Sequence, residues 1–205
     1  EALVKSNLKF ELVSFGTLKL IHRRLQPLKK SINQINKRFF DFIFSFLFLI
    51  LVFWWIAIII AFVIKLTSPG PIFFRQERTG KDGKIFFCIK FRTMTAKKID
   101  LSNTITQIND TRIYPFGQFL RKYNLDELPQ FINVFFGEMS IVGPRPHMIE
   151  EDNKLAKNLV NYRIRHWVRP GITGLAAVKG LRGGTENMRL MQSRIDYDIK
   201  YIETW

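Results

Sequence analysis

An uncharged run of 23 residues, from Phe42 to Ile64, limits what this chain can fold into more than any other feature of its sequence. Ser45 is its only polar residue. As a helix that rises about 1.5 Å per residue, the run would extend roughly 34 Å and could cross the hydrocarbon of a bilayer. Core helices of soluble proteins are seldom apolar on every face over this length, and no small-residue cleavage site follows, as it would after a signal peptide. We therefore predict a membrane helix.

Basic residues flank this run on both sides, which conflicts with a simple span. They are Lys29, Lys30, Lys37 and Arg38 before it and Lys65, Arg75, Arg78, Lys81 and Lys84 after it. The positive-inside rule places both flanks in the cytoplasm, which a helix that enters and returns on one side would satisfy. No proline or glycine stands within the run to bend it, so the residues alone leave the topology open.

The net charge of +15 indicates an anionic partner, which could be an acidic lipid surface, a phosphorylated substrate or nucleic acid. Because a membrane helix already gives the charge an anionic partner, we favour lipid and predict no nucleic acid. A cluster of Arg163, Arg165, Trp167 and Arg169 is expected to line the membrane surface. The single cysteine, Cys88, lies between apolar residues and is expected to be a buried strand residue.

Three parts of the chain differ in composition. Residues 1–36 carry short apolar runs and a basic stretch, which predicts a linker or the tail of a missing N-terminal region, and the first residue, Glu1, also suggests a fragment. Residues 37–67 hold the membrane helix. Residues 68–205 have the length and patterning of a folded domain.

Two runs rich in residues that favour strands predict a β-hairpin in this third part, with strands over 72–78 and 84–93 joined by 79–83. The polar run 96–110 reads as a loop or weak helix. Helical spacing follows at Phe116–Tyr123 and Leu128–Phe136, and Gly137 should end the second helix. Further helices are expected after Pro146 and over 186–201, the last with an apolar stripe of Met188, Met191, Ile195, Ile199 and Ile202. The fold class is therefore α+β and mostly helical.

Two adjacent carboxylates, Asp126 and Glu127, form the candidate site within the stretch LDELPQ. They could simply cap the helix that follows, since acidic residues favour a helix N-terminus. Arginines nearby suggest chemistry instead: Arg121 precedes the pair, and Arg145 stands between two prolines. A rigid arginine can grasp a phosphate with two hydrogen bonds, or it can form a structural salt bridge with the acids.

Carboxylates beside arginines at a helix start suggest phosphoryl transfer. Mg²⁺ is the natural supplement, because one or two carboxylates and substrate phosphates usually hold it, and an aspartate can attack phosphorus. Among the histidines, His22 and His166 are expected to have solvated or interfacial roles, whereas His147 adjoins the rigid arginine. Gly180–Thr185 is a basic, glycine-rich loop that could contact a nucleotide or sugar.

With these residues in place, the chain resembles the bacterial polyprenyl-phosphate phosphoglycosyl transferases, and in particular the catalytic domain of the larger glucose- or galactose-phosphate initiators. The matching segments are KRFFD (37–41), SPGPIFFRQERTG (68–80), KFRTM (90–94), LRKYNLDELPQFINVFFGEMSIVGPRPH (120–147) and RPGITGLAAVKGLRGGTE (169–186). The family's membrane segment is a re-entrant helix, which would explain why basic residues flank the apolar run on both sides. This sequence departs from the family by having Phe53-Trp54 in place of a Ser-Pro pair.

The resemblance implies a monotopic enzyme of the bacterial inner membrane, with residues 68–205 as a cytoplasmic catalytic domain. Asp126 would attack a UDP-sugar, release UMP and pass the sugar phosphate to undecaprenyl phosphate, starting exopolysaccharide, capsule or O-antigen assembly. Asp126 and Glu127 would hold Mg²⁺. The residues expected to bind substrate are Arg121, Arg145, Pro144, Pro146, His147, Gln76, Arg78, Lys90, Arg92 and Arg182.

Two other functions stay open at this point. One is a membrane-anchored nucleotide-sugar-binding or scaffold protein that has the site but no turnover. The other is a membrane-tethered nucleic-acid binder, with strongly salt-dependent affinity. The family analogy also suggests a homodimer.

Overall fold

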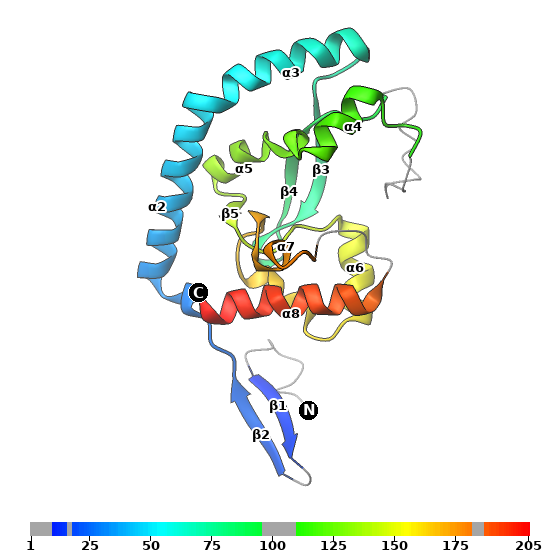
Figure 1. Cartoon of the computed structure of the whole chain (residues 1–205). Helices are drawn as coiled ribbons and strands as arrows, with labels where there is room; N and C mark the ends of the chain where they lie inside the picture. Colours follow the sequence, from blue (N-terminus) through cyan, green and yellow to red (C-terminus); the bar gives the residue numbers. More distant parts are fainter. Residues whose placement is uncertain (1–9, 16–17, 96–109, 182–186) are drawn as a thin grey trace.

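The computed structural model describes residues 10–15, 18–95, 110–181 and 187–205. Most of the polar run 96–110 and the predicted substrate-binding residue Arg182 lie outside these ranges. Within them the structure is mostly helical with small sheets, in agreement with the predicted fold class (Figure 1).

The described residues form three two-stranded sheets. Their strands are β1 (Phe10–Phe15) with β2 (Leu18–Arg23), β3 (Phe73–Thr79) with β4 (Ile85–Phe91), and β5 (Ser140–Val142) with β6 (Gly171–Thr173). The first two pairs are antiparallel and the third is parallel. The apolar runs near the start of the chain thus pair with each other as a hairpin.

The helical elements connect these strands. In chain order they are η1 (Pro27–Lys29), α2 (Ser31–Phe48), η2 (Leu49–Phe53), α3 (Trp54–Thr67), η3 (Lys81–Gly83), α4 (Pro115–Lys122), η5 (Leu125–Glu127), α5 (Gln130–Phe136), α6 (Ile149–Asn158), η6 (Tyr162–Trp167), α7 (Leu175–Val178) and α8 (Met188–Thr204). The helices predicted after Pro115, Leu128, Pro146 and residue 186 all form, although α8 extends three residues further than expected.

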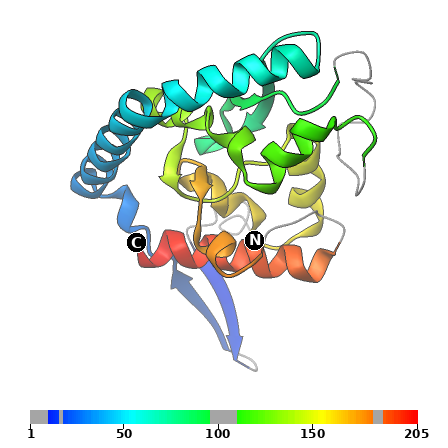
Figure 2. The same ribbon diagram turned by 45° about the horizontal axis from the view of Figure 1, so that its top comes forward.

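The long apolar helix is bent. Its two halves, α2 and α3, meet at the π-helical turn η2, where Figures 1 and 2 show the ribbon changing direction. Phe53 in this turn has only 9% of its surface exposed, and its ring lies 6.1 Å from that of Phe91 on β4. The π-helical turn and its packing on the hairpin therefore account for a bend without proline or glycine.

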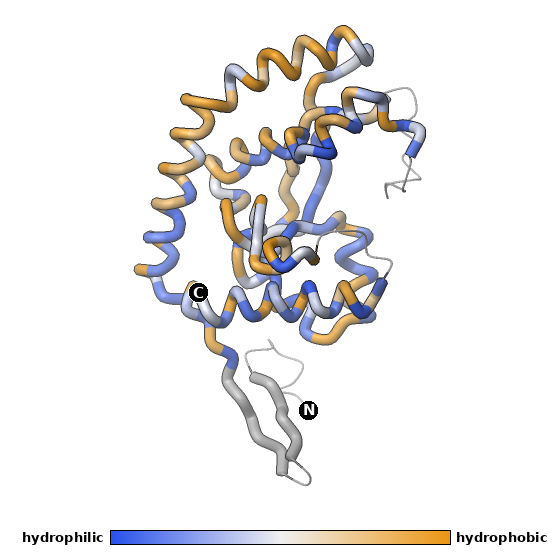
Figure 3. Tube along the Cα trace, in the orientation of Figure 1, coloured by the Kyte–Doolittle hydropathy of each residue, from blue (hydrophilic) through white to orange (hydrophobic). Residues whose placement is uncertain are grey.

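Most of this helix presents apolar side chains to its surroundings. Ser31–Thr67 is long and apolar enough to cross a membrane, and only 17% of its most apolar window is buried. Large exposed side chains include Leu51, Trp55, Ile58, Ile59, Phe62 and Leu66. Figure 3 shows the hydrophobic stretch along α3 and the adjoining half of α2. A core helix would hide this surface, so the exposure favours association with a membrane.

Helix α5 packs along α2 through a series of aromatic rings. Phe131 stacks on Phe48 with 4.0 Å between the ring centroids, and Phe135 lies 5.1 Å from Phe42. Arg38 of α2 adds hydrogen bonds of 2.7 Å and 2.6 Å to the carbonyl oxygens of Val134 and Phe135, near the end of α5. The apolar helix is thus fastened to the helix that follows the acid pair.

Gly137 ends α5 in a left-handed conformation, with φ of +83°, as its position in the sequence predicted. The strands β3 and β4 pair from Phe73↔Phe91 to Thr79↔Ile85, which confirms the hairpin. Cys88 is 2% exposed on β4, as expected of a buried strand residue. In this register Gln76 pairs with Cys88 and Phe74 pairs with Lys90.

The largest core forms where α8 packs on η6, α6 and η1. Met191, Ile195, Ile199 and Ile202 of α8 are buried there, but Met188 is 38% exposed, so the predicted stripe begins one turn later. Glycine is needed at the parallel pair β5–β6, because a Cβ on Gly171 would lie 2.1 Å from a backbone nitrogen. These contacts place β6 against Gly143, just before the Pro144–His147 segment, and α8 against η6.

Candidate active site

Both candidate carboxylates lie on η5, the short 3-10 turn between α4 and α5. Asn124 adopts a left-handed conformation with φ of +55° immediately before the turn. Pro129 is the N-cap residue of α5, and no side chain of the described residues hydrogen-bonds to cap this helix. The capping explanation for the acid pair is therefore not supported, which leaves their surroundings to define their role.

Glu127 is held by two cations. Its side chain accepts two hydrogen bonds from Arg145, of 3.0 Å and 2.5 Å, and one of 2.8 Å from Lys90 Nζ. Burial alone would raise the pKa of Glu127, but Arg145 and Lys90 outweigh it and hold this pKa well below the usual range. Glu127 is therefore an ionised, fixed carboxylate at neutral pH.

Asp126 differs from its neighbour in having no such partner. It is 7% exposed, and its carboxylate makes no hydrogen bond or ion pair with any side chain or backbone group in the described part of the chain. Burial raises the pKa of Asp126, Lys90 and Arg121 oppose that shift, and the charge of Glu127 adds to it. The oxygen lone pairs of this buried acid are thus available to a reacting group.

The backbone around Arg145 is fixed at three consecutive carbonyl groups. The carbonyl of Pro144 accepts a bond from Gly171 N (2.9 Å), that of Arg145 from Arg165 Nη2 (2.6 Å), and that of Pro146 from Arg78 Nη1 (3.1 Å). The Arg145 side chain is nevertheless 47% exposed while it holds Glu127. A rigid base therefore supports a guanidinium that solutes can reach.

Gln76, Arg78 and Lys90 lie on one face of the β3–β4 hairpin, at positions set by its register. Lys90 contacts the acid pair directly. Arg78 and Gln76 lie behind it: Arg78 donates to Gln76 Oε1 at 2.5 Å, and Gln76 Nε2 lies 2.9 Å from Met148 Sδ. These two residues support the Pro144–His147 segment, and their predicted contact with substrate remains a prediction.

The two remaining arginines predicted to bind substrate have different surroundings. Arg121 donates to Thr93 Oγ1 at 2.8 Å, and Asp126 is the main charge opposing the lowered pKa that burial gives it. Arg92 is 2% exposed and directs its guanidinium at the turn after α3, where it bonds Ser68 and the carbonyl oxygens of Pro69 and Pro71. The structure thus brings Arg121 to the acid pair but gives Arg92 a structural position.

A second buried polar cluster, not expected from the sequence, lies behind the Pro144–His147 segment. Arg165 is 3% exposed and pairs with Asp198 at 2.9 Å, so its predicted place on a membrane surface is wrong. His147 Nδ1 lies 2.7 Å from the Tyr162 hydroxyl and 2.8 Å from Arg165 Nη1. The Tyr162 hydroxyl also donates to Asp152 at 2.8 Å.

The surroundings of His147 and His166 differ from what the sequence suggested. Burial and the charge of Arg165 lower the pKa of His147, which keeps its ring neutral. His166 is not solvated, because its Nε2 lies 2.9 Å from Asp152 Oδ1 with the side chain 12% exposed. His147 is thus placed by the structure in a buried network beside the site, where residues distant in sequence meet.

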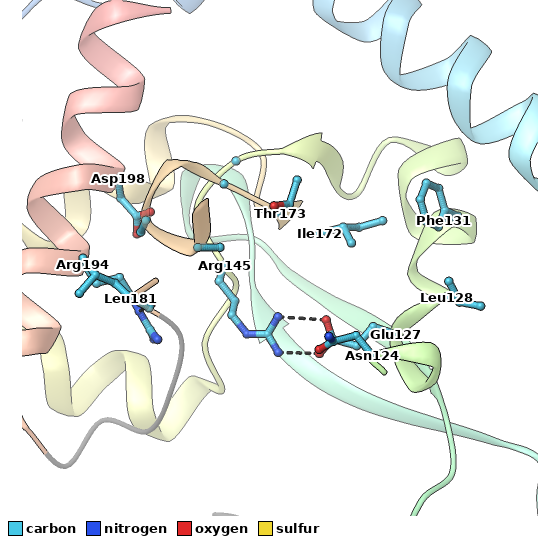
Figure 4. Close-up of a pocket in the computed structure, with 14 residues that line it drawn as sticks. Asn124, Glu127, Leu128, Phe131, Arg145, Ile172, Thr173, Leu181, Arg194 and Asp198 are labelled. Atoms are coloured by element: carbon cyan, nitrogen blue, oxygen red, sulfur yellow. Dashed lines mark hydrogen bonds and ion pairs between the residues drawn. The ribbon is translucent and has the colours of Figure 1, made fainter. Parts of the chain in front are cut away.

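A cavity of about 410 Å³ opens beside the acid pair (Figure 4). Glu127 and Arg145 line one part of it, Leu128, Phe131 and Ile172 line a second, and Thr173, Arg194 and Asp198 line a third. Asp126 is not among the lining residues, although Asn124 and Glu127 on either side of it are. A volume of this order accommodates a ligand of nucleotide-sugar size.

The residues of the acid pair fit Mg²⁺ only together with a phosphate ligand. In the described ranges, no group of three or more His, Cys, Asp or Glu side chains could hold a metal ion. Mg²⁺ usually needs one or two carboxylates when substrate phosphates and water complete its shell. Asp126 has free oxygens, whereas those of Glu127 are engaged by Arg145 and Lys90, so Mg²⁺ binding at the pair stays a prediction.

Comparison with known proteins adds independent information. A family model described as bacterial sugar transferase matches residues 32–205. A UDP-glucose:undecaprenyl-phosphate glucose-1-phosphate transferase of Klebsiella pneumoniae is 47% identical over 85% of this chain and 37% of its own length. The exopolysaccharide production protein PSS of Rhizobium leguminosarum bv. phaseoli is 45% identical over 82% of this chain and 86% of its own length.

A third relative is named for a different sugar. The UDP-N-acetylgalactosamine-undecaprenyl-phosphate N-acetylgalactosaminephosphotransferase of Aeromonas hydrophila is 38% identical over 71% of this chain and 34% of its own length. The chain therefore spans only about a third of the length of two of these three relatives.

Proposed function

Because the chain belongs to the bacterial sugar transferase family, we propose that it transfers a sugar 1-phosphate from a UDP-sugar to undecaprenyl phosphate and releases UMP. The observation that carries this proposal is the contrast between the two adjacent carboxylates. Glu127 is fixed by Lys90 and Arg145, while Asp126 is buried without a partner in the described chain. Of the two, Asp126 is the carboxylate that accepts no hydrogen bond from a described residue, so we assign it as the nucleophile that attacks phosphorus.

The first half-reaction forms a covalent enzyme intermediate. An Asp126 carboxylate oxygen attacks the β-phosphorus of the UDP-sugar, and the bond from that phosphorus to the oxygen bridging the two phosphates breaks. UMP leaves with the bonding electron pair, and the sugar phosphate stays on Asp126 as an acyl phosphate. Both charges that this step brings together are negative, so it needs cations at the attacked phosphate.

Arg145 and Arg121 meet that need. Arg145 keeps 47% of its side chain exposed while fixed to Glu127, so a phosphate can approach its guanidinium from the open side. Arg121 lies close enough to Asp126 for its charge to oppose the raised pKa of that carboxyl. When bound, Mg²⁺ would add positive charge at the phosphates, with Asp126 and Glu127 as its protein ligands.

The second half-reaction returns the enzyme to its first state. A phosphate oxygen of undecaprenyl phosphate attacks the phosphorus held on Asp126, and the carboxylate leaves with its electron pair. The product is a lipid diphosphate sugar. This acceptor is dissolved in lipid, so the site must lie at a membrane surface, and the rings of Phe131 and Phe48 fasten α5 to the apolar helix.

We further infer that the bent apolar helix enters and leaves on the cytoplasmic face of the bacterial inner membrane. The bend at η2 and the basic residues on both flanks support this arrangement. It would place the acid pair on the side that holds UDP-sugars. A homodimer also remains a prediction.

The test is UMP release from UDP-sugars by membrane-embedded protein, with and without Mg²⁺. We expect Asp126→Asn to lower the rate by about 10³-fold or more, because the amide is a poor nucleophile. Asp82→Asn is the matched control, since Asp82 lies in the β3–β4 turn with φ of +55°, which asparagine tolerates. Nucleotide binding by the wild-type protein without any UMP release would instead support a binding or scaffold protein.

A further inference from the structure

One wall of the cavity carries polar groups that the proposed chemistry does not use. It consists of Thr173 on β6 and of Arg194 and Asp198 on α8, and we call it the α8 wall. Arg194 and Asp198 are four residues apart on one helix, so their side chains share a face. Figure 4 shows them side by side, across the cavity from Glu127.

Two residues of the α8 wall, Thr173 and Asp198, have hydrogen-bonding capacity left over. The two hydrogen bonds that Arg165 donates to Asp198, of 2.9 Å and 3.2 Å, both go to Oδ2, so Asp198 Oδ1 has no donor among the described residues. The Thr173 hydroxyl likewise has no hydrogen-bond partner in the described chain. Arg194 is 7% exposed and directs its Nε to the carbonyl oxygen of Leu181 at 3.0 Å, while its side chain lines the cavity.

These three residues present both donors and acceptors to the cavity. A carboxylate oxygen accepts, a guanidinium donates, and a hydroxyl does both. Their natural complement is a ligand whose own groups also donate and accept, such as the hydroxyls of a sugar. A buried polar site of this kind discriminates strongly, because a ligand lacking a matching hydroxyl leaves its polar groups unpaired.

The other parts of the UDP-sugar and the acceptor fit this wall less well. Phe131 is the only aromatic side chain among the cavity's described lining residues, and it stacks on Phe48 of the apolar helix, away from α8. A nucleobase would thus find no ring to stack on at the α8 wall. A prenyl chain would bury the wall's polar groups without partners, whereas Leu128, Phe131 and Ile172 offer it apolar contact.

We propose that Thr173, Arg194 and Asp198 bind the hydroxyl groups of the transferred sugar and so determine which UDP-sugar the protein accepts. This inference rests on the proposed function. The sugar stays on the protein through both half-reactions, whereas UMP leaves before the acceptor reacts. A wall that contacts the sugar therefore acts in both half-reactions.

The test compares variants across a panel of UDP-glucose, UDP-galactose, UDP-N-acetylglucosamine and UDP-N-acetylgalactosamine. The variants are Thr173→Val, which keeps the shape of the side chain, and Arg194→Gln. Asp198 is left intact because it also neutralises Arg165. Controls are Thr204→Val and Arg189→Gln, at exposed positions of α8. The readouts are kcat/KM for UMP release and the inhibition constant of free UMP, which lacks the sugar.

For the donor that the wild-type protein prefers, we expect kcat/KM to fall about 3- to 10-fold in Thr173→Val and about 10- to 100-fold in Arg194→Gln. The ratio between donors should change, while inhibition by UMP stays within about twofold of wild type. A parallel loss of UMP affinity, or an equal loss for all four donors, would overturn the proposal. If the wild-type protein released no UMP from any donor, the proposed function itself would fail.

Discussion

Two buried polar clusters meet at the Pro144–His147 segment, and they differ in how their carboxylates are partnered. In the cluster around Arg165, Asp198 has the guanidinium at 2.9 Å and Asp152 has the Tyr162 hydroxyl at 2.8 Å. In the acid-pair cluster, Glu127 is held by two cations, but Asp126 has no partner in the described ranges. The segment serves both, because the Arg145 side chain enters one cluster and its carbonyl oxygen enters the other.

This difference separates residues that support the fold from residues available for reaction. A buried charge without a partner costs stability, and the fold tolerates it only where something else requires it. A buried charge with good hydrogen bonds keeps its neighbours in place. The contrast makes four predictions about stability, measured as the free energy of unfolding in detergent or lipid.

The largest effect is expected in the cluster around Arg165. Arg165→Met would leave Asp198 buried without its cation and release the carbonyl of Arg145, at a cost of about 3–5 kcal/mol. Arg163→Met is the matched control, because Arg163 is exposed two residues away. Equal stability of the two variants in chemical unfolding would contradict a supporting role for this cluster.

Glu127→Gln should cost less, about 1–3 kcal/mol. The substitution leaves Lys90 and Arg145 without their shared carboxylate, but Arg145 is 47% exposed and water can solvate it. Glu77→Gln, at an exposed position of β3, serves as control. If Glu127→Gln stabilised the protein, the ion pairs would not be holding this site together.

Asp126→Asn should act in the opposite direction and stabilise the protein by about 1–2 kcal/mol, because it removes a buried charge that has no partner. The pH dependence of this stability gain follows from the coupling between proton binding and folding. The pKa of Asp126 is raised in the folded state, so its ionisation destabilises the fold, and the gain from Asn should shrink as pH falls toward the ordinary carboxyl range. If Asp126→Asn were less stable than the wild-type protein at pH 7, the buried charge of Asp126 would not be a cost to the fold, and the contrast with the cluster around Arg165 would be wrong.

The smallest effect concerns His147, whose pKa is lowered by burial and by Arg165. The unfolded state then binds a proton near pH 6.5 that the folded state does not, so stability should decrease as pH falls. One such histidine lowers the free energy of unfolding by about 0.7 kcal/mol when the pH falls from 7 to 6. His147→Asn, which retains an acceptor near the position of Nδ1, should remove that part of the pH dependence.

Local patterns in the sequence predicted much of the fold. Two β-rich runs between residues 72 and 93 predicted the β3–β4 hairpin, helical spacing predicted α5 and α8, and Gly137 marked the end of a helix. The acid pair and the rigid Arg145 were also recognisable, because the charges stand close together and prolines flank the arginine. Each of these signals lies within a short stretch of chain.

Features that depend on distant residues could not be predicted in the same way. Lys90 and Glu127 are 37 residues apart, and Arg165 and Asp198 are 33 apart, so no local pattern pairs them. Arg165 therefore looked like part of a surface cluster. The bend at η2 was hidden too, because it depends on Phe53 packing against Phe91 of the hairpin and not on a proline or glycine.

The central claim is that Asp126, the carboxylate without a partner, becomes covalently bonded to the sugar phosphate. The most direct measurement is mass spectrometry of the intact protein after exposure to a UDP-sugar with Mg²⁺. We expect the wild-type mass to rise by one sugar phosphate, Asp126→Asn to show no increase, and undecaprenyl phosphate to remove the added mass. A sugar phosphate that still forms on Asp126→Asn, or that maps to Glu127, would contradict the assignment.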